Sequence, residues 1–444
     1  MNKQKVKTMM RRNSSLGSVG FSARGGRSRR RRGGSSKLPY LILIGILIVL
    51  LGIAAFLWVR RSPAEHVSSV PASTETDSEN GVISLDNASA PADDSLEGVI
   101  AQAKLLADGY DYDGAINLLS SSTYASDESV TAAIDEYNAT KETLVRADPR
   151  KVTHVFFHTL IMDTSKAFDG DSREKGYNQV MTTKDEFMKI LQSMYERGFV
   201  LVRLHDVAYE VTAEDGSRHF QEGDIMLPEG KKPFVMSQDD VCYYEYMTGQ
   251  GFADRFVLDE NGKITNEYTL DDGTVIRGSF DVLTILEDFI EAHPDFSYRG
   301  ARGTIAVTGY NGIFGYRTSD YWYNWNCEYF DQQNAEERQR MYYNNENIEA
   351  DKAAAKEIAA AMKELGWTIA SHSWGHIYIG SSSYGRVCWD SDMWEREVAP
   401  LVGGTDIIIF AFGEDLDGWQ GYAADNEKFL YLKQKGFDYY CNVD

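Results

Sequence analysis

Beyond residue 148, short β-rich runs alternate with longer segments in which apolar residues recur at a helical period. Strands that alternate with helices are typical of βαβ units, so this pattern predicts an α/β fold with a parallel sheet. The seven predicted strands are VTHVFFH (152–158), FVLVRL (199–204), PFVMSQ (233–238), GTIAVT (303–308), WTIASH (367–372), DIIIFAF (406–412) and FDYYCNV (437–443). The predicted helices span 183–197, 279–292, 351–365, 392–402 and 426–435, and a capping box of Thr183 and Glu186 begins the first. Residues 256–277, with the turn pair Asn261-Gly262, are predicted to form an inserted hairpin.

The first 147 residues divide into four stretches of different pattern. Residues 1–37 are basic, and residues 38–59 form an uncharged apolar run that is long enough to cross a bilayer of about 30 Å hydrocarbon thickness. Residues 60–95 are rich in Ser, Ala, Pro and acidic residues, so they are predicted to be a flexible linker. Residues 96–147 are predicted to form a tetratricopeptide-like helical hairpin and a third helix. One such unit is too short for a solenoid, so a spacer and a docking site for a protein partner both remain open.

Charge is distributed unevenly between these stretches. The 1–37 tail holds twelve Lys and Arg and no acid, so its formal charge is +12. Because the whole chain has a formal net charge of −22, the remainder carries −22 − 12 = −34. The positive-inside rule therefore predicts a single-pass protein of the cell membrane, with a cytoplasmic N-terminus and an extracellular main domain. A cleaved signal peptide is the alternative, but its apolar region usually spans only about 7–15 residues. The acidic main domain makes nucleic acid an unexpected partner, and the basic tail is expected to contact anionic lipid.

The four cysteines, Cys242, Cys327, Cys388 and Cys441, are widely spaced. Their even number permits two disulfides outside the cytoplasm, and buried free thiols are equally compatible with the spacing. No Cys-x-x-Cys pair is present in the sequence, so a structural zinc module of that type is not expected.

Candidate chemistry is concentrated where two predicted strands end. KPFVMSQDDV ends with Asp239 and Asp240 beside its last Val, and SHSWGH carries His372 and His376. Two adjacent carboxylates resist ionising together unless a cation lies close. One Asp and two His form a three-ligand set that leaves a position open on a catalytic metal, and the other Asp stays free as a general base. Because α/β barrels place their chemistry at strand ends, these residues are the predicted site.

The same motifs resemble those of a known family. FVMSQDD is similar to the T-F-D-D motif of the polysaccharide deacetylases with NodB homology, carbohydrate esterase family 4, and HSWGH matches their H-S/T-x-x-H motif. The resemblance covers residues 150–444 and implies a deacetylase domain over 148–444, folded as a distorted (β/α)7 barrel. It also implies that Asp239 is the general base and that Asp240, His372 and His376 bind a divalent metal. Zinc is expected from this ligand set, with cobalt and nickel as alternatives.

Two other motifs depart from the family pattern. VFFH, which ends at His158, resembles the L-x-x-H motif of the general acid, at the position expected in a circularly permuted subgroup; His154 lies earlier on the same face of this strand. IFAFG (409–413) resembles R-x-P-x-G without its Arg and Pro. The backbone N–H of Phe412 is the expected oxyanion donor, and Arg302 or Arg386 is expected to replace the missing Arg that orients the base.

Two residues complete the predicted site. Trp374, within the histidine motif, is the expected substrate-binding residue, because sugar C–H groups stack on aromatic rings. Asp444 resembles the family's fourth motif, and the alternative is that it has no role in the site.

These observations predict a membrane-anchored, extracellular, metal-dependent enzyme that removes N-acetyl groups from a polysaccharide containing N-acetylglucosamine, in the cell wall or an exopolysaccharide. A sugar O-acetyl esterase would use the same chemistry. A glycan-binding or wall-scaffolding module with a weak active site is the alternative from another class, and the missing Arg is the feature that favours it.

Overall fold

The computed structural model describes residues 93–327, 343–418 and 420–442. The predicted basic tail, the apolar run 38–59, most of the linker and Asp444 lie outside these residues. Among the described helices, none is both long and apolar enough to span a membrane.

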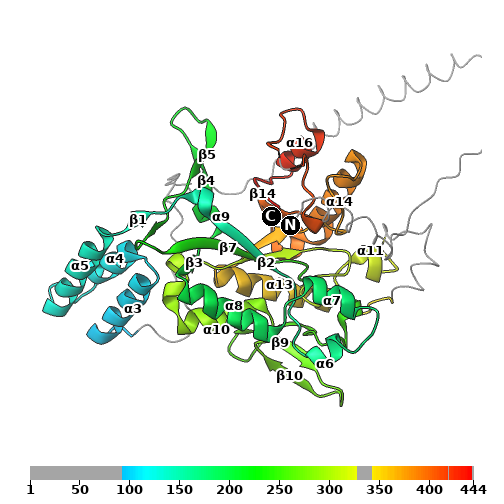
Figure 1. The fold of residues 1–444 in the computed structure, drawn as a ribbon, viewed down its shortest axis with the longest axis horizontal. Helices are drawn as coiled ribbons and strands as arrows, with labels where there is room; N and C mark the ends of the chain where they lie inside the picture. Colours follow the sequence, from blue (N-terminus) through cyan, green and yellow to red (C-terminus); the bar gives the residue numbers. More distant parts are fainter. Residues whose placement is uncertain (1–92, 328–342, 419, 443–444) are drawn as a thin grey trace, which may run out of the picture. The chain divides into compact units, whose positions relative to one another are not determined.

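All seven predicted strands are present in one parallel sheet. They are β2 (Thr153–Phe157), β3 (Phe199–Leu201), β7 (Lys232–Gln238), β11 (Thr304–Val307), β12 (Thr368–Ser371), β13 (Ile407–Ile409) and β14 (Tyr439–Cys441). The order is β14-β13-β12-β11-β7-β2, and β3 pairs with the first half of β7. The sheet curls into a half-barrel, which confirms the α/β class (Figure 1). No pairing of β14 with β2 closes it among the described strands, so the structure does not show the closed seven-stranded barrel.

The central strands are apolar on both faces. Every residue of β11 and β13 is buried, as expected for parallel strands that are covered on both sides. Helices α8 (Lys184–Glu196), α10 (Val282–Ala292) and α13 (Ile348–Glu364) pack apolar faces into the main core, together with β7 and β11 (Figure 1). This core supports the strand ends that carry the candidate site.

The predicted helices are present with shifted boundaries. The capping box of Thr183 and Glu186 at the start of α8 is confirmed. The helix predicted at 392–402 is instead α14 (Tyr384–Glu397), followed by the short α15 (Ala399–Val402). It begins earlier because the Ser383 side chain accepts a hydrogen bond from the Arg386 N–H. The other helices in the described part of the α/β region are α6 (Thr164–Ala167), α7 (Glu174–Val180), α9 (Leu204–Val207), α11 (Asp320–Tyr323) and α16 (Glu427–Gln434). The 3-10 turns described there are η1 (Pro149–Lys151), η2 (Glu245–Met247), η3 (Pro294–Phe296), η4 (Tyr298–Gly300) and η6 (Ala411–Gly413).

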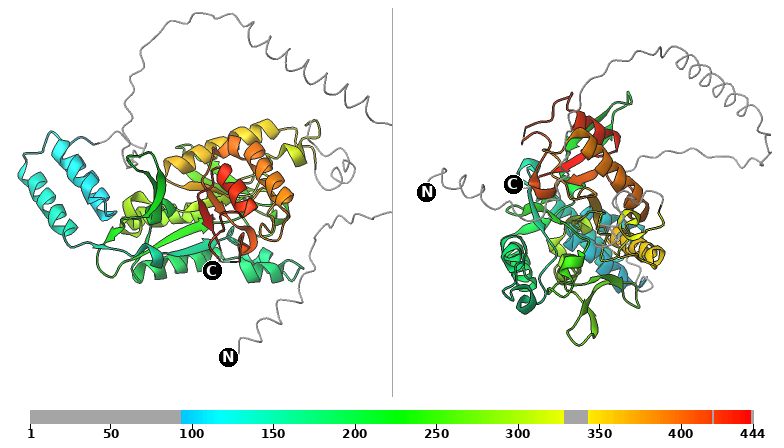
Figure 2. Two further views of the ribbon diagram at one scale, coloured as in Figure 1. Left: turned by 90° about the horizontal axis from the view of Figure 1, so that it is seen from above. Right: turned by 90° about the vertical axis from the view of Figure 1, so that its right-hand side faces the viewer.

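The segment before the sheet contains three helices, α3 (Leu96–Asp108), α4 (Tyr112–Ser121) and α5 (Glu128–Lys141). They enclose a small core of their own, in which Ala103, Ala115 and Leu119 are buried. Helix α5 is followed by the short strand β1 (Val145–Arg146), which pairs with β6 (Met226–Leu227). The helices project from the side of the sheet region, away from α14 and α16 (Figure 2). A docking role for this segment stays a prediction.

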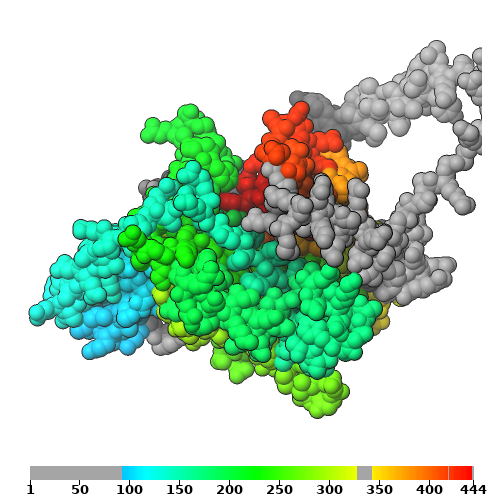
Figure 3. Space-filling view, viewed as in Figure 1, coloured from blue at the N-terminus to red at the C-terminus, as the bar shows by residue number. Residues whose placement is uncertain are grey.

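Two antiparallel additions lie outside the parallel sheet. The predicted insertion at 256–277 forms β8 (Arg255–Leu258), β9 (Ile264–Thr269) and a third strand, β10 (Val275–Gly278). A second hairpin, β4 (Ala208–Thr212) and β5 (Arg218–Glu222), was not predicted and projects from the surface (Figure 3).

All four cysteines are free thiols. Of the two possibilities that their spacing allowed, disulfides and free thiols, the structure shows free thiols.

Candidate active site

The predicted site residues follow the carboxyl ends of four parallel strands. His158 follows β2, Asp239 and Asp240 follow β7, His372 follows β12, and Phe412 lies in η6 just after β13. In a parallel sheet these ends share one edge. Two strands separate β2 from β12, so the curl of the sheet is what brings His158 toward the histidine motif.

Three predicted metal ligands converge on one point. Asp240, His372 and His376 each offer a ligand atom, and these atoms all lie within 4.8 Å of one another. The distance from Asp240 Oδ2 to His376 Nε2 is 3.4 Å, and that from Asp240 Oδ1 to His372 Nε2 is 3.9 Å. Two imidazoles and one carboxylate are a donor set typical of catalytic zinc sites, so these three residues fit a divalent metal.

The environment favours the protonation states that bind a cation. Burial, assisted by the neighbouring imidazoles and opposed by the charge of Asp240, lowers the pKa of His376 to about 4, so this ring is neutral near pH 7. Burial alone would raise the pKa of Asp240, but the charges of the three surrounding histidines and a hydrogen bond hold this pKa below its ordinary value. His372 Nδ1 lies 2.9 Å from the Ile409 carbonyl oxygen. Donation of an Nδ1 proton there leaves the Nε2 lone pair directed at the site.

The backbone around the triad is strained. Asp240, Ser373, His376 and Phe412 have φ values of 59°, 59°, 49° and 60°, in the left-handed region that non-glycine residues rarely occupy. Such strain persists only where surrounding contacts impose it, and it concentrates at functional sites. One of these contacts is Asp390 on α14, which accepts the N–H groups of the two residues between Ser373 and His376, at 2.7 and 2.9 Å.

Tyr244 is a site residue that the sequence analysis missed. Its hydroxyl donates a 2.6 Å hydrogen bond to Asp240 Oδ1, and the side chain is buried. Partners of this kind fix the orientation of a metal ligand. Tyr244 follows Asp240 through irregular backbone, so no periodicity in the sequence indicated the contact.

A hydrogen-bonded chain holds the predicted base. Asp239 is only 3% exposed, and its Oδ1 accepts a 2.8 Å hydrogen bond from Ser237 Oγ. The Ser237 hydroxyl lies 3.0 Å from His154 Nε2. Because the hydroxyl proton goes to Asp239, His154 Nε2 acts as a donor to the serine oxygen. Strand alternation places Ser237 and Asp239 on one face, a signal that was available in the sequence.

The arginines expected to orient the base do not do so. Arg302 Nε donates to Glu287 Oε1 at 2.7 Å, and Arg386 lies 3.8 Å from Asp390. Both side chains serve other carboxylates, so the expectation that one of them replaces the missing Arg is wrong. In the structure, Asp239 is instead held by Ser237, which His154 contacts in turn.

His158 lies beside the triad. Its Nδ1 lies 3.1 Å from the Val180 carbonyl oxygen, and its Nε2 lies 3.9 Å from Asp240 Oδ2. Donation of the Nδ1 proton to that carbonyl orients the ring with Nε2 toward the site. The side chain is partly exposed, so a substrate can reach it.

Phe412 is also at the site. Its ring centroid lies 4.3 Å from that of His376. The role of the Phe412 backbone N–H as an oxyanion donor stays a prediction.

Trp374 is not available to a substrate in this structure, which corrects the prediction. The side chain is 2% exposed, and its indole N–H donates a 2.8 Å hydrogen bond to Glu397 Oε2. Its ring packs against those of Tyr321 and Trp389. Trp374 is a core residue that holds the histidine motif against α14. Its indole N–H is hydrogen-bonded there and its apolar ring is packed against other aromatic rings.

Glu397 makes the stability of this region depend on pH. Burial raises the pKa of Glu397 from 4.5 to about 7, although it accepts hydrogen bonds from Ser319, the Tyr321 N–H and Trp374. A folded-state pKa above the unfolded value means that the contribution to stability is full below about pH 4.5 and is lost as the pH rises through about 7. We expect this group to lower the free energy of unfolding by at most about 3 kcal/mol from pH 4.5 to pH 8.

Urea denaturation at pH 5 and pH 8 measures this effect. The decrease should be smaller in Glu397→Gln than in the wild-type protein, since the variant has no proton to lose. Burial also raises the pKa of Asp390, to about 6, so part of the decrease should remain in the variant. An equal decrease in both proteins would show that Glu397 does not titrate in this range.

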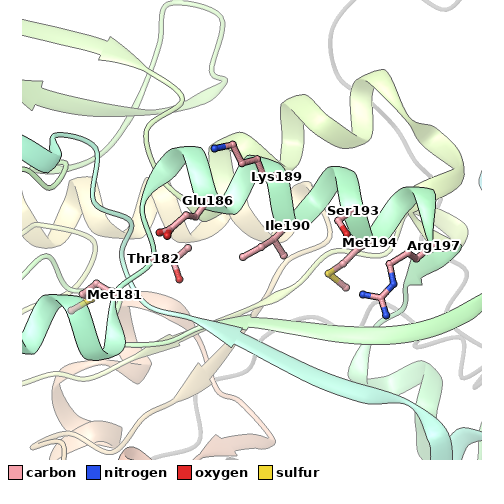
Figure 4. A pocket seen from close by; sticks show the side chains of 8 residues that line it. All are labelled: Met181, Thr182, Glu186, Lys189, Ile190, Ser193, Met194 and Arg197. Carbon is pink, nitrogen blue, oxygen red and sulfur yellow. The ribbon is translucent and has the colours of Figure 1, made fainter.

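A surface pocket on another part of the fold is a separate feature. A pocket of about 560 Å³ lies along α8 and contains none of the strand-end residues (Figure 4). It is lined by Met181, Thr182, Glu186, Lys189, Ile190, Ser193, Met194 and Arg197. The candidate site is therefore identified by its converging side chains and not by cavity size.

Comparisons with known proteins add little to this geometry. No protein-family model matches the chain, and no curated protein matches it. Among solved structures, the deacetylase PplD from Streptococcus pyogenes, in complex with acetate, aligns with 66% of this chain and 82% of its own. The sequence identity is 10% and the TM-score is 0.31, so this similarity is too weak to support an argument about function.

Proposed function

We propose that this chain is a metal-dependent deacetylase that hydrolyses the N-acetyl groups of a polysaccharide containing N-acetylglucosamine. The observation that carries the proposal is the convergence of Asp240, His372 and His376 at one sheet edge, with Asp239 and His158 beside them. The resemblance of the two sequence motifs to those of polysaccharide deacetylases supports an acetylated sugar as the substrate. Zinc is the proposed metal, because two imidazoles and a carboxylate match its preference.

Amide hydrolysis needs an activated water, a stabilised oxyanion and a proton for the leaving amine. A divalent metal at the triad would supply Lewis acidity toward the acetyl carbonyl and the attacking water. Asp239, held by Ser237, accepts the proton of that water. The Phe412 N–H donates to the developing oxyanion, and His158 donates a proton from Nε2 to the amine as the C–N bond breaks. The products are acetate and a free amino sugar.

Location at the cell membrane is part of the proposal. It is supported by the uncharged run at 38–59 and by the basic residues before it, which predict a cytoplasmic N-terminus and an extracellular catalytic domain. A glycan substrate outside the cell is consistent with that arrangement.

The alternative of a binding module rested on the missing Arg. The hydrogen-bonded chain from His154 through Ser237 gives Asp239 another means of orientation, so the absence of the Arg no longer favours a weak site. A sugar O-acetyl esterase remains the second candidate, because the same residues can hydrolyse an ester.

The test is acetate release from N-acetylglucosamine oligomers by purified residues 62–444. Activity should disappear after treatment with a chelator and return when zinc is added. An O-acetylated glycan assayed in parallel separates the esterase from the deacetylase. Retention of the glycan without acetate release, in the presence of bound zinc, would reject the enzyme and favour the binding module.

Loss of the Ser237 hydroxyl should impair the base without affecting substrate binding. We expect Ser237→Ala to lower kcat about tenfold and to leave KM unchanged. A tenfold decrease corresponds to the loss of about one charge-assisted hydrogen bond. Ser297→Ala is the matched control, because Ser297 is also buried and its hydroxyl donates to the Ala301 carbonyl. Equal kcat values for the two variants would contradict a role for Ser237 in orienting Asp239.

A further inference from the structure

Two exposed aromatic rings lie together beside the triad. Tyr378 is 52% exposed and Phe412 is 53% exposed. Their ring centroids are 3.8 Å apart and their planes differ by 7°, so the rings are stacked. The Phe412 ring also contacts the ring of His376, with centroids 4.3 Å apart. The pair therefore extends an apolar surface outward from a metal-ligating side chain.

The backbone keeps these rings exposed to solvent, and for Phe412 this requires an unfavourable backbone conformation. Ile377 and Ile379, on either side of Tyr378, are buried in one cluster with Phe410. Anchoring both neighbours turns the Tyr378 side chain toward solvent. Phe412 has a φ of 60°, which is unfavourable for a bulky side chain, and its exposed ring recovers little of that cost by burial. Such strain with no evident gain in stability points to a functional role.

Polar residues lie on the same two loops as the rings. The two loops that carry the pair also carry Ser381 and Glu414, which are joined by a 3.1 Å hydrogen bond, and the exposed Asp417. Carboxylates accept hydrogen bonds from hydroxyl groups. An aromatic face with such acceptors on the same loops suits a sugar, whose ring has an apolar C–H face and a polar rim of hydroxyls. The negative face of an aromatic ring attracts the slightly positive C–H hydrogens.

We propose that Tyr378 and Phe412 form a stacking platform for a pyranose ring of the substrate, next to the sugar whose acetamido group reaches the triad. The platform rests on the proposed function, and it specifies that the substrate is a chain of sugars and not a single acetylated sugar. It also replaces Trp374, which is buried, as the aromatic contact to the glycan.

Binding measured without turnover tests the platform. Asp239→Asn is the background, and isothermal titration calorimetry measures its affinity for the N-acetylglucosamine pentamer and monomer. Adding Tyr378→Ala should weaken pentamer binding about tenfold, equivalent to about 1.4 kcal/mol, with little effect on the monomer. Tyr378→Phe should restore pentamer binding, because it keeps the ring. Tyr384→Ala is the control, since Tyr384 is exposed on α14 and is not part of the pair.

The KM of Tyr378→Ala for the pentamer, in the otherwise wild-type protein, is the second measurement and should rise about tenfold. Unchanged pentamer affinity and KM in an enzyme that releases acetate would overturn the platform and leave the proposed function intact. A wild-type protein that neither binds nor deacetylates the oligomers would overturn both.

Discussion

Replacing Asp239 with asparagine should lower kcat for acetate release by roughly 10²–10⁴-fold, the usual contribution of a general base. The asparagine carbonyl can still accept the hydrogen bond from Ser237, so the local structure should persist. Asp240, His372 and His376 are unchanged, and the variant should therefore bind as much zinc as the wild-type protein. Acetate release and metal content, measured on the same preparation, check both expectations.

Asp288→Asn is the matched control, because it removes a carboxylate from the exposed side of α10. It should leave both kcat and zinc content unchanged. Turnover by Asp239→Asn at the wild-type rate, with zinc bound, would assign the base to another group. Loss of zinc together with activity would instead indicate that Asp239 acts as a ligand.

Replacing His158 with alanine should affect substrates according to their leaving group. An amine needs a proton when the C–N bond breaks, so deacetylation of the pentamer should slow by roughly 10²–10⁴-fold. The phenolate of 4-nitrophenyl acetate leaves without a proton, and its hydrolysis should change little. The ratio of the two rates in wild-type and variant enzyme is the measurement.

His154→Ala is the contrast to this variant. His154 contacts the base through Ser237, so its loss should slow the amide and the ester alike. If His158→Ala slows both substrates equally, the residue is not the general acid. In that case its contact with the Val180 carbonyl would point to a structural role.

The central strands β11 and β13 could be predicted because they are buried. β13 is wholly apolar and β11 is apolar apart from Thr304, and a run of this type gives a clear signal of where the strand lies. The hairpin β4–β5 gave no such signal, since every residue of β5 is exposed and its pairing depends on backbone hydrogen bonds that composition does not reveal. The start of α14 was missed because a local cap at Ser383 outweighed the apolar periodicity.

The candidate site was predictable where residues follow strand ends. Asp240, His372 and His376 meet because parallel strands end at one edge, which is a consequence of topology. Tyr244 reaches Asp240 through irregular backbone, and irregular backbone has no periodicity. Trp374 was misassigned because a tryptophan in a site motif can face either the substrate or the core, and only the position of Glu397 decides between them.

The three proposed metal ligands come from segments that are far apart in the chain, since Asp240 follows β7 and both histidines follow β12. An unfolded chain cannot present them together, so a metal held by this triad would bind almost only to the folded form. Mass action then couples occupancy to stability: free zinc at 100 times its Kd would stabilise the protein by about 2.7 kcal/mol. The melting temperature thus becomes a direct reading of metal affinity, and it can rank metals and ligand variants before any substrate is known.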